Sequence, residues 1–134
     1  MSGTSDAWLN LTHAVAAVEA DLGRFLQRQH GLGLSELRAL KILAKSPNNE
    51  LRMQDLAAHM QLNQSSVSRM AERLERRGLA LRDLCPDDKR GVYTVLTDAG
   101  RDCLSRAEGD YDAALKDLVK THRLDANMLT IKQT

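Results

Sequence analysis

Apolar residues recur every three or four positions over residues 5–30, the first segment of the chain with a clear pattern. The seam follows spacings of 3-4-3-4-3 and consists of Trp8, Leu11, Val15, Val18, Leu22 and Phe25. This spacing places the side chains on one face of an α-helix, so it predicts a long amphipathic helix. The seam is about two and a half heptads long, which leaves a coiled-coil partner and an intramolecular core as equal alternatives.

Three shorter helices are predicted next, over residues 34–45, 53–60 and 64–77. The cluster Ser46-Pro47-Asn48-Asn49 is expected to end the first of them. Gln61-Leu62-Asn63 has the composition of a turn, and Gly78 is suited to closing the last helix. The last two segments therefore form a helix–turn–helix pair.

From Leu79 onwards the period changes. Two short β-prone runs, residues 79–84 and 92–96, flank the polar loop Cys85–Gly91, which predicts a hairpin. Thr97 is placed to cap another helix that runs to about Lys120. A weaker helix is expected over residues 124–131. The predicted fold is mainly α with one small β-hairpin, in a single domain of residues 1–134.

The segment 64–77 has two contrasting faces at 100° per residue. Val67, Met70, Ala71 and Leu74 form the side expected to pack, while the opposite side carries Ser65, Arg69, Glu72, Arg73 and Arg76. Short hydroxyl residues at the amino end, followed by arginines, suit insertion into the major groove of DNA. The alternative is a solvated face with helix-spaced pairs such as Arg69/Glu72 and Glu72/Arg76.

Charge is nearly balanced, with 19 basic and 18 acidic residues among 134 and a net charge of +1. Between Gln64 and Arg90, seven basic residues stand against five acidic ones. Because phosphate contacts dominate affinity for DNA, one copy is expected to bind weakly and a symmetric dimer to be needed. With four aromatic residues in the chain, a base-stacking platform for single strands is not expected.

Four motifs in this order resemble the MarR family of bacterial transcription regulators. They are Ser66-Val67-Ser68-Arg69, Arg73-Leu74-Glu75-Arg76-Arg77-Gly78-Leu79, Pro86-Asp87-Asp88-Lys89-Arg90-Gly91-Val92 and Val95-Leu96-Thr97-Asp98-Ala99-Gly100. The resemblance implies a winged helix–turn–helix over residues 34–100, flanked by dimerisation helices at 5–30 and 101–132. It also implies a homodimeric regulator, in most cases a repressor, that binds palindromic double-stranded DNA and is released by a small aromatic or lipophilic effector or by cysteine oxidation.

The resemblance and the helix wheel together nominate the DNA-binding residues. The candidates are Gln64, Ser65, Ser66, Ser68, Arg69, Arg73 and Arg76 on the recognition helix, and Lys89 and Arg90 on the wing. By analogy the recognition helix enters the major groove and Arg90 reaches the minor groove. Asp88 is expected to orient the wing through an ion pair with an arginine, for which Arg73 is the choice.

Other kinds of site are less well supported by the sequence. His13, His30, His59 and His122 are scattered without metal-ligand spacing, so neither a metal site nor a cofactor is expected. No catalytic constellation can be assembled, which argues against an enzyme. Trp8 and Tyr111 are candidates for lining an effector pocket, although aromatic residues at helical spacing more often belong to a core.

Cellular location follows from two weak signals. The uncharged stretch Ala7–Val18 is too short to span a bilayer, and it lacks the preceding positive charge of a secretory signal. The cysteines Cys85 and Cys103 do not form a disulfide framework, so a reduced cytoplasmic chain is expected.

The two cysteines differ in their expected reactivity. Cys103 lies in an apolar context, whereas Cys85 precedes the charged loop. There, nearby Lys89 and Arg90 favour a reactive thiolate, and Asp87 and Asp88 oppose it.

Two classes of function therefore remain. The first is a DNA-binding transcription regulator, with a thiol-based redox sensor using Cys85 as a variant of it. The second is a winged helix used only as a protein-interaction module. An interaction face is expected to expose apolar anchors, whereas this one carries arginines, which favours the regulator.

Overall fold

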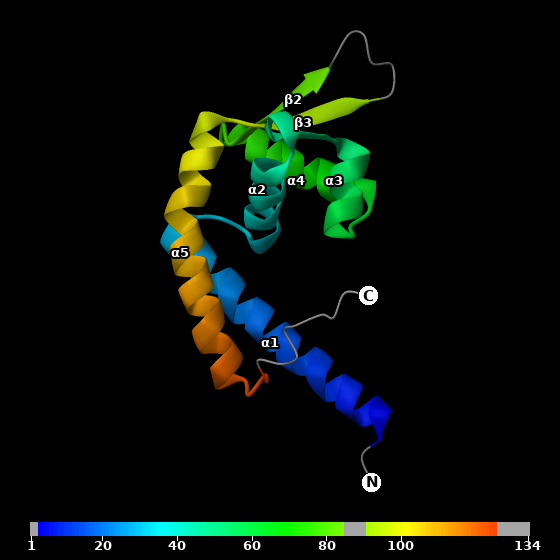
Figure 1. Cartoon of the computed structure of the whole chain (residues 1–134), viewed down its shortest axis with the longest axis vertical. Helices are drawn as coiled ribbons and strands as arrows, with labels where there is room; N and C mark the ends of the chain where they lie inside the picture. Colours follow the sequence, from blue (N-terminus) through cyan, green and yellow to red (C-terminus); the bar gives the residue numbers. More distant parts are fainter. Residues whose placement is uncertain (1–2, 85–90, 126–134) are drawn as a thin grey trace. The chain divides into compact units, whose positions relative to one another are not determined.

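The computed structural model describes residues 3–84 and 91–125 and places them in two compact units. One unit comprises residues 32–107, and the other combines residues 1–31 with residues 108–134. Helices α1 (Thr4–His30) and α5 (Asp98–Thr121) are the longest elements (Figure 1). Among the described residues, no helix is long and apolar enough to cross a membrane.

The unit of residues 32–107 contains three short helices, the first part of α5 and a small antiparallel sheet. Its helices are α2 (Leu34–Lys45), α3 (Met53–Met60) and α4 (Gln64–Arg76), with a short 3-10 turn η1 (Pro47–Asn49) after α2. Its strands are β1 (Glu50–Arg52), β2 (Ala80–Leu84) and β3 (Val92–Leu96), in the order β1-β3-β2. In Figure 1, β2 and β3 form the hairpin beside α3 and α4. The winged helix–turn–helix architecture predicted from the sequence is confirmed.

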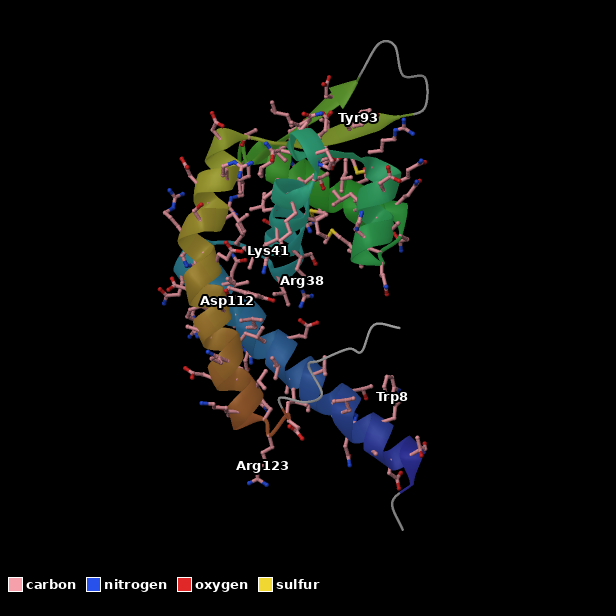
Figure 2. The ribbon with its side chains drawn as sticks, viewed as in Figure 1. Trp8, Arg38, Lys41, Tyr93, Asp112 and Arg123 are labelled. Carbon is pink, nitrogen blue, oxygen red and sulfur yellow. The ribbon has the colours of Figure 1, made fainter. Side chains whose placement is uncertain are left out.

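Strand β1 was not predicted from the sequence. It pairs with β3 through Glu50↔Val95, Leu51↔Thr94 and Arg52↔Tyr93. Three residues are too few to show the alternation that identifies a strand, so only the partner strand reveals it. Arg52 donates from Nε to the Tyr93 hydroxyl over 3.0 Å, and its guanidinium lies 5.7 Å from the centroid of that ring. Figure 2 labels Tyr93 on β3.

The core of this unit is formed by one face of each helix. Leu37, Leu40 and Leu43 of α2 are fully buried. They share this core with Leu56 of α3 and with the four α4 residues expected to pack, Val67, Met70, Ala71 and Leu74. The packed face of α4 that its helical periodicity predicts is therefore confirmed.

The end of α4 connects the recognition helix to β2 through a compact turn. Gly78 has φ +72°, the left-handed conformation that glycine adopts without penalty. Its amide donates to the Glu75 carbonyl over 2.9 Å, and the Leu79 amide donates to the Leu74 carbonyl over 2.9 Å. This pair of bonds is the Schellman arrangement, and it places the buried Leu79 against the base of the helix.

In the unit of residues 1–31 and 108–134, the seam of α1 is only partly covered. Val18 and Leu22 are buried, but Trp8 is 66% exposed and Val15 is 43% exposed. Histidine–aspartate contacts join α1 to the later chain: His30 Nε2 lies 2.8 Å from Asp110 Oδ2, and His122 Nε2 lies 3.1 Å from Asp21 Oδ2. The His122 bond holds the pKa of the Asp21 carboxyl below its usual value.

The carboxyl end of the chain differs from the prediction where the structure describes it. Helix α5 ends at Thr121, and Arg123 adopts φ +60°. Leu124 and Asp125 are not helical, whereas the helix predicted from the sequence begins at Leu124. A left-handed residue interrupts the α-helical hydrogen-bond ladder, which explains why α5 does not continue through this point. The rest of the predicted helix lies outside the described residues.

Candidate nucleic-acid interface

Helix α4 presents an exposed polar face from its first turn. Asn63 caps the helix, with its side-chain oxygen accepting from the Ser66 amide over 2.8 Å. Gln64 and Ser65 are exposed, and Ser66 and Ser68 are half-buried. The amino end of α4 therefore carries small hydroxyl groups together with the positive end of the helix dipole, a combination that favours phosphate oxygens.

Arg69 is the exposed arginine nearest to this hydroxyl cluster. It has no ion-pair partner within the part of the chain that the structure describes. Of the two pairs that the solvated-face alternative expects, Glu72/Arg76 is present at 3.9 Å, whereas Arg69/Glu72 is not formed among the described residues. Glu72 also lies 3.9 Å from Arg82. The Arg69 guanidinium is therefore available for an external anion or a base edge.

Arg73 is engaged with the protein itself. Its Nε lies 3.4 Å from Oε1 of Glu36, a residue of α2 that is 9% exposed. Arg77 reaches the second oxygen of the same carboxylate, at 3.6 Å. Two arginines thus share one nearly buried acid, and this arrangement ties the second half of α4 to α2. Sequence reasoning missed Glu36, because nothing in the spacing of α2 indicates a partner on α4.

Arg76 is more exposed than Arg73 and Arg77, with 76% of its side chain accessible, and its contact with Glu72 at 3.9 Å is long. A solvated pair of this length contributes little stability, so the Arg76 side chain remains free to reorient.

The candidate residues of the wing tip, Asp88, Lys89 and Arg90, lie outside the described residues, as does Cys85. The expected Asp88–Arg73 pair stays a prediction for that reason. The described cysteine, Cys103, is buried with a free thiol. Burial in an apolar core is the environment of an unreactive cysteine.

The two effector candidates, Trp8 and Tyr111, have different environments. Trp8 lies near the amino end of α1 among side chains of that helix (Figure 2). Tyr111 of α5 is buried, at 9% exposure. An open groove of about 460 Å³ lies between α1 and α5, and neither aromatic residue lines it. Its walls include Asp21, Phe25, Arg28, Asp110, Ala114 and Leu118.

Comparisons with known proteins agree on one family. The model of the MarR family matches residues 32–92. The chain is 31% identical over 104 residues to the homoprotocatechuate degradative operon repressor of Escherichia coli, covering 76% of this chain and 69% of that protein. It is also 31% identical over 80 residues to the uncharacterised regulator YkoM of Bacillus subtilis, covering 59% of this chain and 50% of YkoM, so it spans about half of that relative's length.

Among solved structures, the chain is similar to Sco3205 of Streptomyces coelicolor, a MarR family transcriptional regulator solved in complex with DNA. The sequence identity is 32% and the TM-score is 0.84, with 96% of this chain and 84% of that chain covered.

Proposed function

Since the chain belongs to the MarR family of transcriptional regulators, we propose that it acts as a homodimer that binds a palindromic operator in double-stranded DNA and represses transcription. Residues 34–100 are proposed as the DNA-binding lobe, and residues 5–30 and 101–132 as the dimerisation helices. Such a regulator works in the cytoplasm, where its DNA is.

The observation that carries the DNA-binding proposal is the face of α4. The buried Val67, Met70 and Leu74 leave Ser65 and Arg69 directed outward, and Arg69 has no described acidic partner to neutralise it. Small hydroxyl groups permit close approach to the major groove, and an unpaired arginine can bind guanine through two hydrogen bonds. Sco3205, whose structure was solved with DNA, is a relative at 32% identity.

The dimer proposal rests on the uncovered part of α1. Trp8 and Val15, in the amino half of the seam, are 66% and 43% exposed, and Leu9, next to Trp8 in the sequence, is 52% exposed. Contiguous exposed apolar side chains favour an interface, and a second copy doubles the number of phosphate contacts. The fold supplies few cations per copy, because Arg73, Arg77 and Arg82 are paired with acids.

The function is tested by selecting duplexes from a random library and measuring their affinity at several salt concentrations. We expect the selected sequences to show dyad symmetry and binding to weaken steeply with salt. Sedimentation at micromolar concentration should show a dimer. A protein-interaction module would bind selected and scrambled duplexes equally poorly, and a monomeric chain would contradict the dimer.

A small aromatic or lipophilic effector is proposed to release the operator. An effector bound near the proposed dimerisation helices would change the spacing of the two recognition helices, which must match about one turn of DNA. Trp8 and Tyr111 remain candidates for its site. Thermal-shift screening with aromatic acids, with and without the selected duplex, would identify such a ligand. In the redox alternative, peroxide releases the wild-type protein and not a Cys85→Ser variant.

If the wing reads DNA, operator binding should weaken both when Arg90 loses its positive charge and when Asp88 loses its negative charge. Arg90→Ala is expected to weaken operator binding by about 1–3 kcal/mol per subunit and to lower the salt slope by about one per wing. Arg90→Lys should recover only part of the loss, because the ammonium is more strongly hydrated than the guanidinium. Asp88→Ala is expected to weaken binding, although it removes a negative charge. Tighter binding by Asp88→Ala, together with unchanged binding by Arg90→Ala, would contradict a DNA-reading wing.

A further inference from the structure

The carboxylate of Glu75 on α4 receives three hydrogen bonds from one residue of the wing. Arg82 of β2 donates from Nη2 over 3.0 Å and from Nε over 3.3 Å to Oε1 of Glu75. The backbone amide of Arg82 donates to the other oxygen, Oε2, over 3.1 Å. Glu72, one turn earlier on α4, lies 3.9 Å from Arg82 Nη1. Both oxygens of Glu75 are therefore occupied by the same strand residue.

The position of Arg82 explains why this contact holds the strand. Among the described strands, which follow the order β1-β3-β2, β2 is at the edge, so its outward amides have no described strand to pair with. The backbone amide of Arg82 is one of these outward amides, and it donates its hydrogen bond to the Glu75 carboxylate. Arg82 lies opposite Thr94 in the hairpin register and two residues before the end of β2 at Leu84. The contact therefore lies close to where the loop of Lys89 and Arg90 begins.

The position of Glu75 on the helix is unfavourable unless it has a partner. It lies in the last turn of α4, where the negative end of the helix dipole disfavours a carboxylate. Its hydrogen bonds to Arg82 offset this repulsion, and they hold the pKa of Glu75 below its usual value while raising that of Arg82. The pair also neutralises an arginine on a surface where cations would help DNA binding.

We infer that Glu75 and Arg82 are positioning residues that hold β2, and with it the wing, at a set distance from the recognition helix. This inference rests on the proposed function. The root of the hairpin is fixed separately by the buried Leu79 and Ala80, whereas Leu81 is 54% exposed. Beyond the root, the Glu75–Arg82 contact joins β2 to α4. A strand β2 held in this way keeps its distance from α4 when the protein binds DNA, so this part of the hairpin needs no rearrangement on binding.

A purely electrostatic view of Glu75 predicts the opposite effect. If Glu75 were only a carboxylate near DNA, its neutralisation would reduce repulsion of phosphate and tighten binding. In Glu75→Gln, one acceptor oxygen is replaced by an amide nitrogen, so the guanidinium and the Arg82 amide can no longer bond to separate oxygens. The positioning role therefore predicts weaker binding after the loss of a negative charge.

The DNA-binding test uses the full chain, the selected duplex and a matched control. Glu75→Gln is expected to weaken operator binding roughly tenfold and to lower the salt slope by about one per wing. Arg82→Gln should do the same, and the double variant should lose no more than either single one. Asp83→Asn is the control, because it removes the same charge at the residue after Arg82, and the Asp83 side chain has no hydrogen bond or ion pair with the other described residues. It should bind as well as wild type or slightly tighter.

A second measurement works without DNA. In Glu75→Gln, hydrogen exchange at the Arg82 amide is expected to accelerate roughly tenfold, while the buried amides of α4 keep the wild-type rate. Unchanged exchange at Arg82, or a Glu75→Gln variant that binds like Asp83→Asn with the wild-type salt slope, would overturn the inference. If wild type itself shows no salt-dependent duplex binding, the proposed function fails, and exchange still reports whether Glu75 holds β2.

Discussion

Replacing Gly100 with alanine is expected to destabilise the protein by about 3 kcal/mol or more, although alanine is the best helix former. Gly100 is in the first turn of α5. A Cβ at this position would lie 2.0 Å from the Leu79 carbonyl oxygen and 2.8 Å from a methyl group of Leu96. The carbonyl cannot easily move away, because it accepts from the Thr97 amide over 3.2 Å.

Thr97 makes this junction rigid. Its hydroxyl donates to the Gly78 carbonyl over 2.6 Å and accepts from the Gly100 amide over 3.0 Å. The end of α4 and the start of α5 are thus joined within a few ångströms, and displacing Leu79 would disturb both. Chemical denaturation of Gly100→Ala should show the loss as a lower midpoint at an unchanged m-value.

Gly109→Ala is the matched control in the same helix. A Cβ at Gly109 meets no atom within 4 Å, so only helix propensity changes there. We expect Gly109→Ala to stabilise the protein by up to about 1 kcal/mol. Equal stability of the two variants would contradict the close approach of Leu79 to α5.

The second large effect concerns Arg69. Arg69→Ala is expected to weaken operator binding by about 1–3 kcal/mol per subunit, hence about 2–6 kcal/mol for a dimer, and to relax sequence preference. Its exposed guanidinium has no described protein partner, so the loss should appear in DNA binding and not in stability. Affinities for the selected duplex and its single-base variants, measured together with thermal unfolding, test both parts.

Alanine variants of two other arginines serve as controls for Arg69→Ala. Arg106→Ala removes the same charge from the exposed surface of α5 and should change affinity little. Arg73→Ala should weaken binding and also lower stability, because it leaves the nearly buried Glu36 with one arginine fewer. If Arg69→Ala lowers stability and leaves base preference unchanged, Arg69 is a structural residue and the assignment of α4 to the major groove is wrong.

Most of the fold could be predicted because its signals are local. The periodicity of α4 placed Val67, Met70, Ala71 and Leu74 in the core, and each of them is buried. Gly78 and Thr97 marked the helix boundaries on which they act. The apolar seam of α1 is equally clear in the sequence, but its spacing does not predict which positions another helix covers. Leu22 and Trp8 both belong to the seam, yet Leu22 is 1% exposed and Trp8 is 66% exposed.

In the candidate interface too, some features follow from local sequence patterns and others depend on tertiary packing. The order of elements and the outward face of α4 are encoded locally, since both follow from the 3.6-residue period of a helix and the 2-residue period of a strand. Which arginines form ion pairs depends on the tertiary packing. Glu36 reaches Arg73 and Arg77 across 37 and 41 residues, and Glu75 reaches Arg82 across the turn at Gly78. Ion pairs of this kind depend on where helices and strands pack, and no local pattern encodes those distances. Arg69, in the first half of α4, has no acidic partner among the described residues.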